Sequence, residues 1–496
     1  MLFRRSYLTL FCLLLFIFIC FGVNTFGFID SDLGWHLQLG HYLLLHGIPK
    51  TDPFSYTMPS YPFIDHEWLS NIILFKLYNA IGLTGLSFLF CLLVLITLLL
   101  QLLFLKPSKV LFSLLLLQGL SLNSYMGIRP IVVDWLFSEI LFILFYFPNL
   151  WKKYRYATPL LMLLWVNLHG GFAIGIAFLL LFVTSSALIQ KKVNKTDFVV
   201  VLISILSTFI NPYNLRIWYE VWNQISDSAL HNRIVEWLPT FFFLQIIIWT
   251  YIVISVIFVT KYFKELNKAQ LLFYYVLLAV GISTFRHLPF WLLYALPITN
   301  SAISKFIEDV KNIPFAMKRL NTLYKFFLLF IFIVLITQLY PDFLPGSRDF
   351  YPVNAVIYLK KHPFSGQLFA PYEWGGYLIW QYPQKKVFID GRMPSWRWQS
   401  RSNKESNDAF SDYEKVLNGT LPLQSIINKY HITHILFYKD IAEQNPPNSY
   451  LDSFFNFLPS WLTNNPINKN VLSNELIKAN FHLVYKDNIA VIYQKL

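Results

Sequence analysis

The sequence predicts a polytopic α-helical membrane protein with a C-terminal extracytoplasmic α/β domain. Three observations lead to this fold class. Hydrophobic residues make up 56% of the 496 residues, long apolar segments alternate with short basic ones, and the composition becomes polar after residue 341. Apolar runs close to 20 residues are typical of transmembrane helices. We therefore expect a membrane domain at 1–341 and a soluble domain at 342–496.

Eleven apolar segments are expected to form transmembrane helices. They lie at 7–28, 81–105, 110–126, 131–147, 157–168, 172–189, 198–211, 241–260, 270–284, 288–303 and 324–341. The segments at 157–168 and 198–211 are shorter than the usual ~20 residues and are candidates for tilted, broken or re-entrant helices. The first segment lacks a clear small-residue cleavage site, so we expect an uncleaved helix rather than a signal peptide.

Basic residues predict the orientation of these helices. Lys and Arg concentrate in every second connection, at 4–5, 106–109, 152–155, 191–195, 261–268 and 305–325. Positive charge favours the cytoplasmic side of a membrane. We therefore expect a cytoplasmic N-terminus, 11 crossings and an extracytoplasmic C-terminal domain. The net charge of +13 then reflects orientation in the membrane, and no nucleic acid is expected as a partner.

The cysteines exclude several kinds of site. Cys12, Cys20 and Cys91 all lie inside apolar segments. This placement provides no disulfide framework, no CxxC pair and no thiolate metal site.

The C-terminal segment reads as a small α/β domain. We predict a helix over 353–361, strands at 368–370 and 386–390 on either side of a helix at 374–380, and a further strand at 434–438. Segments 481–485 and 489–493 predict a hairpin that turns at Asp487-Asn488. About 150 residues are enough to bury a core of their own.

The first outer loop, residues 29–80, is rich in ionisable side chains. Asp32 is placed to cap a helix over 33–46 that ends at Gly47–Pro49, and Asp65 to cap a second helix with His66 and Glu67 in its first turn. Both helices are expected to lie on the membrane surface. Ionisable groups at this density beside a bilayer indicate either a solvated loop or a site.

This loop resembles the GT-C superfamily of integral-membrane glycosyltransferases. The family has an acidic residue just after its first transmembrane helix, in a large loop with two amphipathic helices. The residues that carry the resemblance are Asp32–Leu37, Gly47–Pro49, Asp52–Ser55 and His66–Leu69. They are similar to a bacterial, polyprenyl-phosphate-sugar-dependent branch of the superfamily.

The resemblance implies transfer of a sugar from a polyprenyl-phosphate carrier to a glycan, lipid or protein acceptor outside the bacterial inner membrane. An acceptor hydroxyl is a poor nucleophile, so a carboxylate must take its proton, and one base suffices in an inverting reaction. Arg or Lys stabilises the departing phosphate. No cofactor is implied with certainty, and a divalent metal is possible in such families.

Asp32 is the expected base because it matches the acidic position of the family. A plain helix N-cap is the alternative interpretation of Asp32, and Asp30 is the alternative base. His66 and Glu67 are candidates to orient the acceptor or hold a divalent cation. Their simpler interpretation is a helix start, with Glu67 beside the positive end of the dipole.

Two further groups of candidates lie in the outer loops and the C-terminal domain. For the lipid phosphate, Arg286 and His287 rank before Arg129 and Arg216, with interfacial snorkelling as the alternative. The acceptor-side candidates are Trp35, His36, His169, Trp374, Tyr377, Asp390 and Arg392. A structural histidine is the alternative at His169, and a turn with a local ion pair is the alternative at 390–392.

Two other functional classes are compatible with the sequence. A transporter or flippase of lipid-linked sugars would place polar groups near the membrane midplane, where Glu139 is the clearest charge. A non-catalytic envelope-glycan assembly factor would lose the activity-linked acids, which are present here.

Overall fold

The computed structural model describes residues 2–27, 29–191, 194–227, 231, 234–339, 350–396, 405–439 and 469–496. The chain forms two compact units, each built from segments that are distant in sequence. The helical unit comprises Met1–Ile29, Ile81–Leu215 and Ile234–Ser347, and the mixed unit comprises Asp30–Ala80, Arg216–Arg233 and Arg348–Leu496. The first loop thus groups with the C-terminal segment, whereas the sequence-based division at 341/342 assigns it to the membrane domain.

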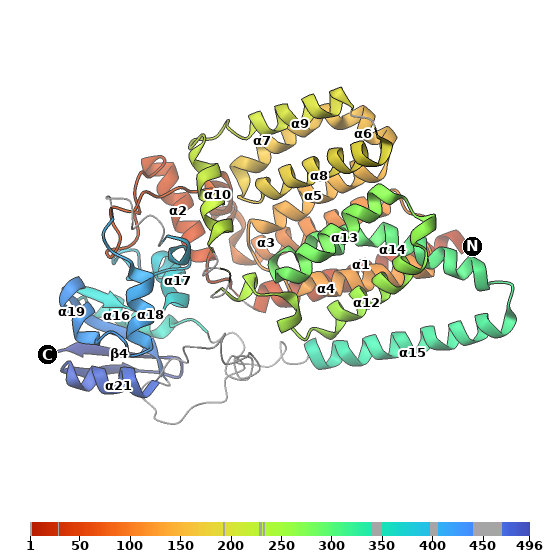
Figure 1. Cartoon of the computed structure of the whole chain (residues 1–496). Coiled ribbons are helices and arrows are strands. Elements are labelled where there is room, and N and C mark those ends of the chain that lie inside the picture. The colour runs from red at the N-terminus through yellow and green to blue at the C-terminus, as the bar shows by residue number, and fades with distance from the viewer. Residues whose placement is uncertain are drawn as a thin grey trace. The chain divides into compact units, whose positions relative to one another are not determined.

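The helical unit contains a helix at every predicted apolar segment (Figure 1). These helices are α1 (Leu2–Gly27), the later part of α3 (Trp68–Leu102), α4 (Lys109–Asn123), α5 (Ile131–Tyr146), α7 (Thr158–Leu168), α8 (Phe172–Gln190), α9 (Lys195–Ser207), α12 (Ile246–Lys261), α13 (Lys268–Ser283), α14 (Leu288–Val310) and α15 (Pro314–Leu339). The short helix α6 (Pro148–Tyr154) precedes α7. Helix α3 passes from the mixed unit into the helical unit and is broken at Gly82, whose φ of 66° is left-handed.

Within the described part of the chain, three helical segments are long and apolar enough to cross a membrane: Leu8–Phe26, Trp68–Leu102 and Phe172–Ile189. A fourth is added if the bent pair Ile131–Tyr146 and Pro148–Leu168, with an angle of 116° between its parts, counts as one span. The described chain is therefore compatible with a helical membrane protein.

A proline explains the polar contacts at the centre of the helical unit. Pro297 lies inside α14 and has no N–H to donate to the carbonyl of Leu293 four residues earlier. Gln101 Nε2 donates to that carbonyl instead, at 3.0 Å, and also to the buried Glu139 carboxyl at 2.7 Å. The adjacent carbonyls of α14 accept from Gln118 and Tyr146. Side chains of α3, α4 and α5 thus hold α14 at its proline.

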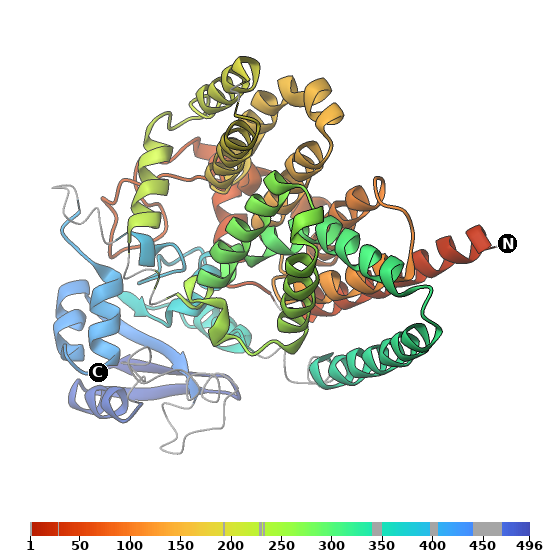
Figure 2. The same ribbon diagram turned by 45° about the vertical axis from the view of Figure 1, so that its right-hand side comes forward.

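Helix α15, teal in Figures 1 and 2, lies along the outside of the helical unit, and most of its described side chains are exposed. A helix with Phe326, Leu329 and Phe332 turned outward would be poorly solvated in water. The exposed apolar side chains are what a lipid-facing helix requires.

The mixed unit has a four-stranded sheet covered by helices. Its strands are β1 (Gln367–Phe369), β2 (Ile432–Tyr438), β3 (Phe481–Lys486) and β4 (Ala490–Lys495), in the order β1-β2-β4-β3. The pair β1–β2 is parallel, and the other two pairs are antiparallel. Helices α2 (Leu33–His46), α10 (Arg216–Ser226), α16 (Val353–Lys361), α17 (Gly375–Gln381), α18 (Ala409–Leu417), α19 (Leu423–Tyr430) and α21 (Lys469–Lys478) complete the unit. The predicted helices at 33–46 and 353–361 and the predicted hairpin are confirmed.

Backbone contact joins α2 to α17 within the mixed unit. A Cβ added at Gly34 would lie 2.1 Å from the carbonyl oxygen of Gly376, and one added at Gly376 would lie 2.1 Å from that of Ser31. Only glycine permits so close an approach. Gly34 and Gly376 therefore serve the packing of the first loop against the C-terminal segment.

Candidate active site

The first loop and the C-terminal segment are joined by backbone hydrogen bonds. The Val387 N–H donates to the carbonyl of Phe54 (2.9 Å), and the Tyr56 N–H donates to the carbonyl of Val387 (3.2 Å). The predicted strand at 386–390 is wrong, because this segment forms only an isolated parallel bridge between Ser55 and Val387. Its partner is the irregular first loop and not the sheet. The bridge brings the turn at 390–392 to the acidic residues of the loop.

Asp32 occupies the N-cap position of α2 but does not cap it. Its backbone has helical angles (φ −90°, ψ −21°), and its carboxylate accepts no N–H from the helix. Asp32 Oδ1 accepts instead from the indole N–H of Trp35 at 3.1 Å. Asp30 Oδ1 accepts from the Asp32 N–H at 2.9 Å and so fixes the start of the helix. The expectation of side-chain capping by Asp32 is therefore wrong.

Gly391 makes room for the Asp32 carboxylate. A Cβ at position 391 would lie 2.1 Å from Asp32 Oδ1. Of the five carboxylates in the described first loop, Asp32 is the only one that is not buried. The other four, at positions 30, 52, 65 and 67, are between 2% and 7% exposed.

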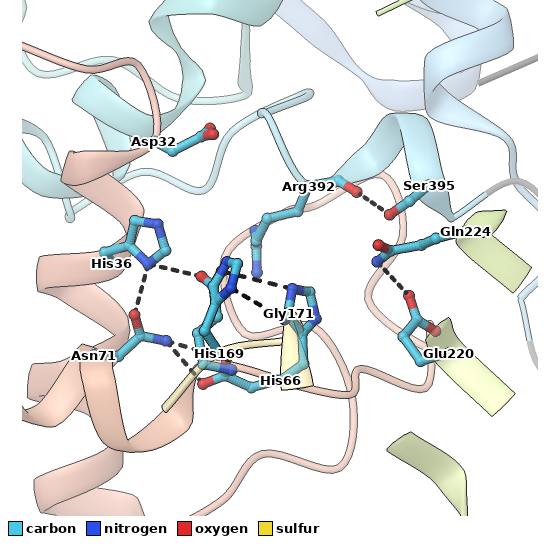
Figure 3. A network of polar contacts seen from close by, with 12 residues as sticks. Asp32, His36, His66, Asn71, His169, Gly171, Glu220, Gln224, Arg392 and Ser395 are labelled. Carbon is cyan, nitrogen blue, oxygen red and sulfur yellow. Dashed lines mark hydrogen bonds and ion pairs between the residues drawn. The ribbon is translucent and has the colours of Figure 1, made fainter. Parts of the chain in front are cut away.

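Behind Asp32, four residues of the loop form a buried polar cluster (Figure 3). His36 Nδ1 lies 2.6 Å from Asn71 Oδ1 and 3.4 Å from Glu67 Oε2. Asn71 Nδ2 donates to both oxygens of Asp65, at 3.1 and 2.9 Å. His66 Nε2 lies 3.7 Å from Glu67 Oε1 at the edge of the cluster.

Asp65 does not cap a helix that contains His66 and Glu67, because α3 begins only at Trp68. Its Oδ1 accepts from the Glu67 N–H at 3.0 Å in a turn before the helix. Burial, followed by the nearby Glu67 carboxylate, raises the pKa of Asp65 to about 7 against the lowering effect of its hydrogen bonds. Asp65 thus titrates near neutral pH.

Arg392 lies in a sealed ion-pair centre. Its Nε and Nη2 donate to the two oxygens of Asp390, each at 2.7 Å, and its Nη1 lies 3.0 Å from Asp52 Oδ1. The rings of Trp35, Phe54, Phe63 and Trp396 surround the guanidinium, with centroids 5.0–5.8 Å from Cζ. Burial alone would lower the pKa of Arg392, but Asp390 and Asp52 raise it. The cation is neutralised within the fold.

Trp374 and Tyr377 are also buried in the mixed unit. The Trp374 indole donates to the carbonyl of Phe350 at 3.0 Å, and its side chain is fully buried. The Tyr377 ring stacks on Tyr351 with 4.7 Å between centroids. Trp35 is 8% exposed and is held by its bond to Asp32. These aromatic candidates pack the interior of the unit in this conformation.

The helical unit brings two of the phosphate candidates together. Arg129 and Arg286, distant in sequence, both pair with Glu236 in a short 3₁₀ turn, η2 (Val235–Trp237). Arg286 Nη1 lies 3.3 Å from Glu236 Oε2, and Arg286 Cζ lies 5.6 Å from the centroid of the Trp237 ring. Burial alone would raise the pKa of Glu236, but Arg129 and Arg286 lower it to about 2. Two cations therefore share one carboxylate.

The other two phosphate candidates are placed differently. His287 follows Arg286 in η5 (Phe285–His287), and its Nδ1 lies 3.2 Å from Thr284 Oγ1. Arg216 begins α10 in the mixed unit and is exposed. Arg216 therefore belongs to a different unit from the Arg129–Arg286 pair.

His169 has a carboxylate partner that sequence reasoning did not identify. Its Nδ1 lies 2.6 Å from Asp134 Oδ2 on α5, and the indole of Trp165 donates to Asp134 Oδ1, also at 2.6 Å. A Cβ at Gly171 would lie 2.2 Å from Asp134 Oδ2, so the glycine leaves room for this carboxylate. His169 and Gly171 are labelled in Figure 3. The signal available in the sequence was an acid, Asp134, near the start of the apolar segment 131–147.

Three other residues of these polar clusters were not site candidates from the sequence. Asn71 reads as an ordinary helix residue, Asp65 as a cap, and Glu236 as one polar residue of an outer loop. Their importance depends on partners from other segments. Among the described residues, no group of three or more His, Cys, Asp and Glu side chains is arranged to hold a metal ion.

Comparison with protein-family models gives no match for this chain, and comparison with curated proteins finds no similar protein.

Proposed function

We propose that this protein is an integral-membrane glycosyltransferase that transfers a sugar from a polyprenyl-phosphate-linked donor to a glycan, lipid or protein acceptor on the extracytoplasmic side. One observation carries the proposal. Asp32 is the first-loop acid that remains partly exposed while the other four are buried, and the absence of a side chain at Gly391 makes room for its carboxylate. An accessible carboxylate on a rigid helix start is suited to take a proton from an acceptor hydroxyl.

The proposed reaction is an inverting displacement. Asp32 removes the proton of the acceptor hydroxyl while the oxygen forms a bond to the anomeric carbon. The bond between that carbon and the donor phosphate breaks, and its electron pair leaves with the phosphate. Arg129 and Arg286 are the proposed phosphate ligands, because both guanidiniums lie against Glu236 at a partly exposed position of the helical unit.

The proposed topology has 11 crossings in the bacterial inner membrane, a cytoplasmic N-terminus and the mixed unit outside. It depends on the alternation of basic connections along the chain. A transporter or flippase of lipid-linked sugars is the second candidate. The buried Glu139 and Gln101 in the helical unit favour it, although Gln101 also serves the α14 carbonyl at the proline.

Asp32→Asn tests the proposal. In a deletion strain, complementation with wild type should restore surface glycans and consume lipid-linked sugars, whereas Asp32→Asn should leave the lipid-linked sugars accumulated. With purified protein and the lipid fraction of the deletion strain as donor, turnover should fall by roughly 10²–10⁴-fold. The melting temperature should stay unchanged, because the Asp32 carboxylate caps no helix.

Asp30→Asn is the matched control, since Asp30 is buried and bonds the Asp32 N–H. It should retain more turnover than Asp32→Asn. An Asp32→Asn protein that melts and turns over normally would end the proposed role of Asp32. A transporter would instead move labelled lipid-linked sugar between leaflets without forming any transfer product.

A further inference from the structure

Helix α10 of the mixed unit has the reverse of the polarity expected for a helix in water. Its side chains Tyr219, Trp222 and Ile225 are 58%, 67% and 55% exposed. Because they are spaced three residues apart, they share one face of the helix, the outer face. The only acid of α10, Glu220, is buried and accepts from Gln224 Nε2 at 3.3 Å. The helix thus buries its carboxylate and exposes its large apolar side chains.

Two other short helices of the same unit show the ordinary arrangement. Helix α18 buries Tyr413 and exposes Lys415, and helix α19 buries Ile426 and exposes Gln424. An amphipathic helix at the surface of a water-soluble unit is expected to have this polarity. The outer face of α10 is instead suited to an apolar environment.

The chain joins α10 closely to the apolar helix α9. Only residues 208–215 separate the two helices, and a fully extended stretch of this length would span about 30 Å at most. The connection is shorter than this because it contains turns, one of them closed by the Asn214 N–H donating to the carbonyl of Asn211 at 3.3 Å. Leu206 of α9 and Leu215, directly before α10, are both exposed. Exposed apolar side chains therefore continue along the chain from α9 into α10.

The size and composition of the outer face favour lipid over a second protein. A buried aromatic side chain contributes roughly 150–250 Å². Since Leu215, Tyr219, Trp222 and Ile225 are each just over half exposed, together they offer on the order of 500 Å². A stable protein interface needs roughly 800 Å² from each partner. Trp and Tyr are also enriched where a bilayer meets water, because each has an apolar ring and a polar group.

The charged groups of α10 fit the same environment. Arg216, the first residue of the helix, is exposed, and its long side chain can reach the phosphate of a lipid headgroup. Glu220 faces the first loop instead. Burial, followed by the Glu220 carboxylate, raises the pKa of Tyr61 in that loop. The anionic group that would repel lipid phosphates is therefore held within the protein.

We propose that α10 binds a phospholipid surface, with Leu215, Tyr219, Trp222 and Ile225 inserted beneath the headgroups. The apolar face of such a helix lies about 5–10 Å into the boundary between headgroups and acyl chains. Helix α10 thereby attaches the mixed unit to the membrane surface. This inference requires that the helical unit lies in a bilayer, and it does not depend on glycosyl transfer.

Spin labels on the full-length protein test this placement, in nanodiscs of phosphatidylcholine and phosphatidylglycerol. Every protein carries Cys12→Ala, because Cys12 is the exposed native cysteine, whereas Cys20 and Cys91 are buried. A label on Trp222→Cys should collide more often with O₂, which dissolves in lipid, than with Ni-EDDA, which stays in water. Gln424→Cys, on the exposed face of α19, is the matched control. The ratio of O₂ to Ni-EDDA collisions should be several-fold higher for Trp222→Cys than for Gln424→Cys.

Two outcomes would overturn the proposal. Equal ratios in Trp222→Cys and Gln424→Cys would mean that the outer face lies in water. Protection of the Trp222→Cys label from both reagents would mean that protein covers this face, either a second copy of the chain or another partner. Tyr219→Cys and Ile225→Cys keep Trp222 in place and give the same measurement if Trp222→Cys does not fold.

Tryptophan fluorescence gives a check without a label. The difference in emission between wild type and Trp222→Phe isolates Trp222 among the 15 tryptophans. Lipids with bromine on the acyl chains near the headgroup should quench this difference, and acrylamide in the water should quench it little. The opposite result would contradict lipid contact. Normal turnover in Asp32→Asn would remove the proposed base and leave both measurements on α10 valid.

Discussion

Arginine side chains have different ionic partners and different exposure in the two units of this protein. In the mixed unit, one guanidinium, Arg392, faces two carboxylates, and its side chain is 4% exposed. In the helical unit, Arg129 and Arg286 share the single carboxylate of Glu236, and their side chains are 31% and 32% exposed. In the first centre two carboxylates thus surround one almost fully buried guanidinium, and in the second two partly exposed guanidiniums flank one carboxylate.

The difference separates structural charge from charge that can bind a ligand. A guanidinium already chelated by Asp390 and enclosed by aromatic rings has little capacity left for a substrate anion. The guanidiniums of Arg129 and Arg286 are partly exposed, so a phosphate can approach them. The sequence made Arg286 the first candidate for the lipid phosphate and Arg392 a candidate for the acceptor side, with a local ion pair as the alternative at 390–392. The partners of Arg392 support that alternative.

The largest expected effect is at Arg392. Arg392→Leu removes the cation that bridges Asp52 and Asp390, so two buried carboxylates would lose their shared partner. Breaking a buried ion pair in this way costs about 3–5 kcal/mol of stability. Thermal unfolding of the purified protein measures the loss. Asp52→Asn is the control and should cost much less, since it leaves the Arg392–Asp390 pair intact. Equal melting of Arg392→Leu and wild type would contradict a structural role.

An intermediate effect is expected at Arg286, in binding rather than stability. Arg286→Gln should raise the apparent KM for the lipid donor about tenfold or more, because a charge-assisted hydrogen bond contributes roughly 1.5–3 kcal/mol. The melting temperature should change little at this partly exposed site. Arg216→Gln removes an exposed arginine from the other unit and should leave the KM unchanged. If both variants have the same KM, the cation pair is not a phosphate site.

The smallest effect is expected at Glu236 and depends on pH. The two arginines lower its pKa from the ordinary 4.5 to about 2. A lowered pKa stabilises the fold fully above pH 4.5, and this stabilisation is lost as the pH falls from 4.5 through 2. Wild type should therefore lose more stability than Glu236→Gln in this window. Above pH 4.5, the melting temperature of Glu236→Gln should be slightly lower than that of wild type. Glu236→Gln should also bind the donor slightly more tightly, because the carboxylate no longer offsets the charge of the arginines. Parallel melting curves from pH 5 to 3 would argue against the shared ion pair.

Local pattern predicted much of the secondary structure. Every predicted apolar segment is a helix, and the helices at 33–46 and 353–361 have the predicted bounds. These elements follow from periodicity and from breakers such as Gly47. The prediction of a strand at 386–390 was wrong because an apolar run such as Val-Phe-Ile can also form an irregular buried segment. Here that segment pairs with the first loop at Ser55. The predictions that Asp32 and Asp65 cap helices were also wrong. The Asp32 carboxylate accepts from the Trp35 side chain, and the Asp65 carboxylate accepts from the Asn71 side chain.

The residue pairs in the candidate site could not be predicted from local sequence patterns. Glu236 joins two arginines from different loops, and Asp134 meets His169 across two helices. Neither pairing leaves a spacing signal in the sequence, because each partner comes from a separate element. The acidic first loop could be identified from composition, but only the burial of its members distinguishes Asp32 from Asp52.

The mixed unit has a consequence for the biosynthesis of the protein. Thr57 donates to the carbonyl of Phe388, 331 residues later, and Asn407 reaches back to the carbonyl of Thr57. At a synthesis rate of about 5–20 residues per second, the first loop waits roughly 15–65 s for these partners. A nascent chain therefore carries all five loop acids long before Gly391 and Arg392 exist to pack beside them. The surroundings of Asp32 are complete only in a nearly finished polypeptide, so chains that stop early cannot assemble this site.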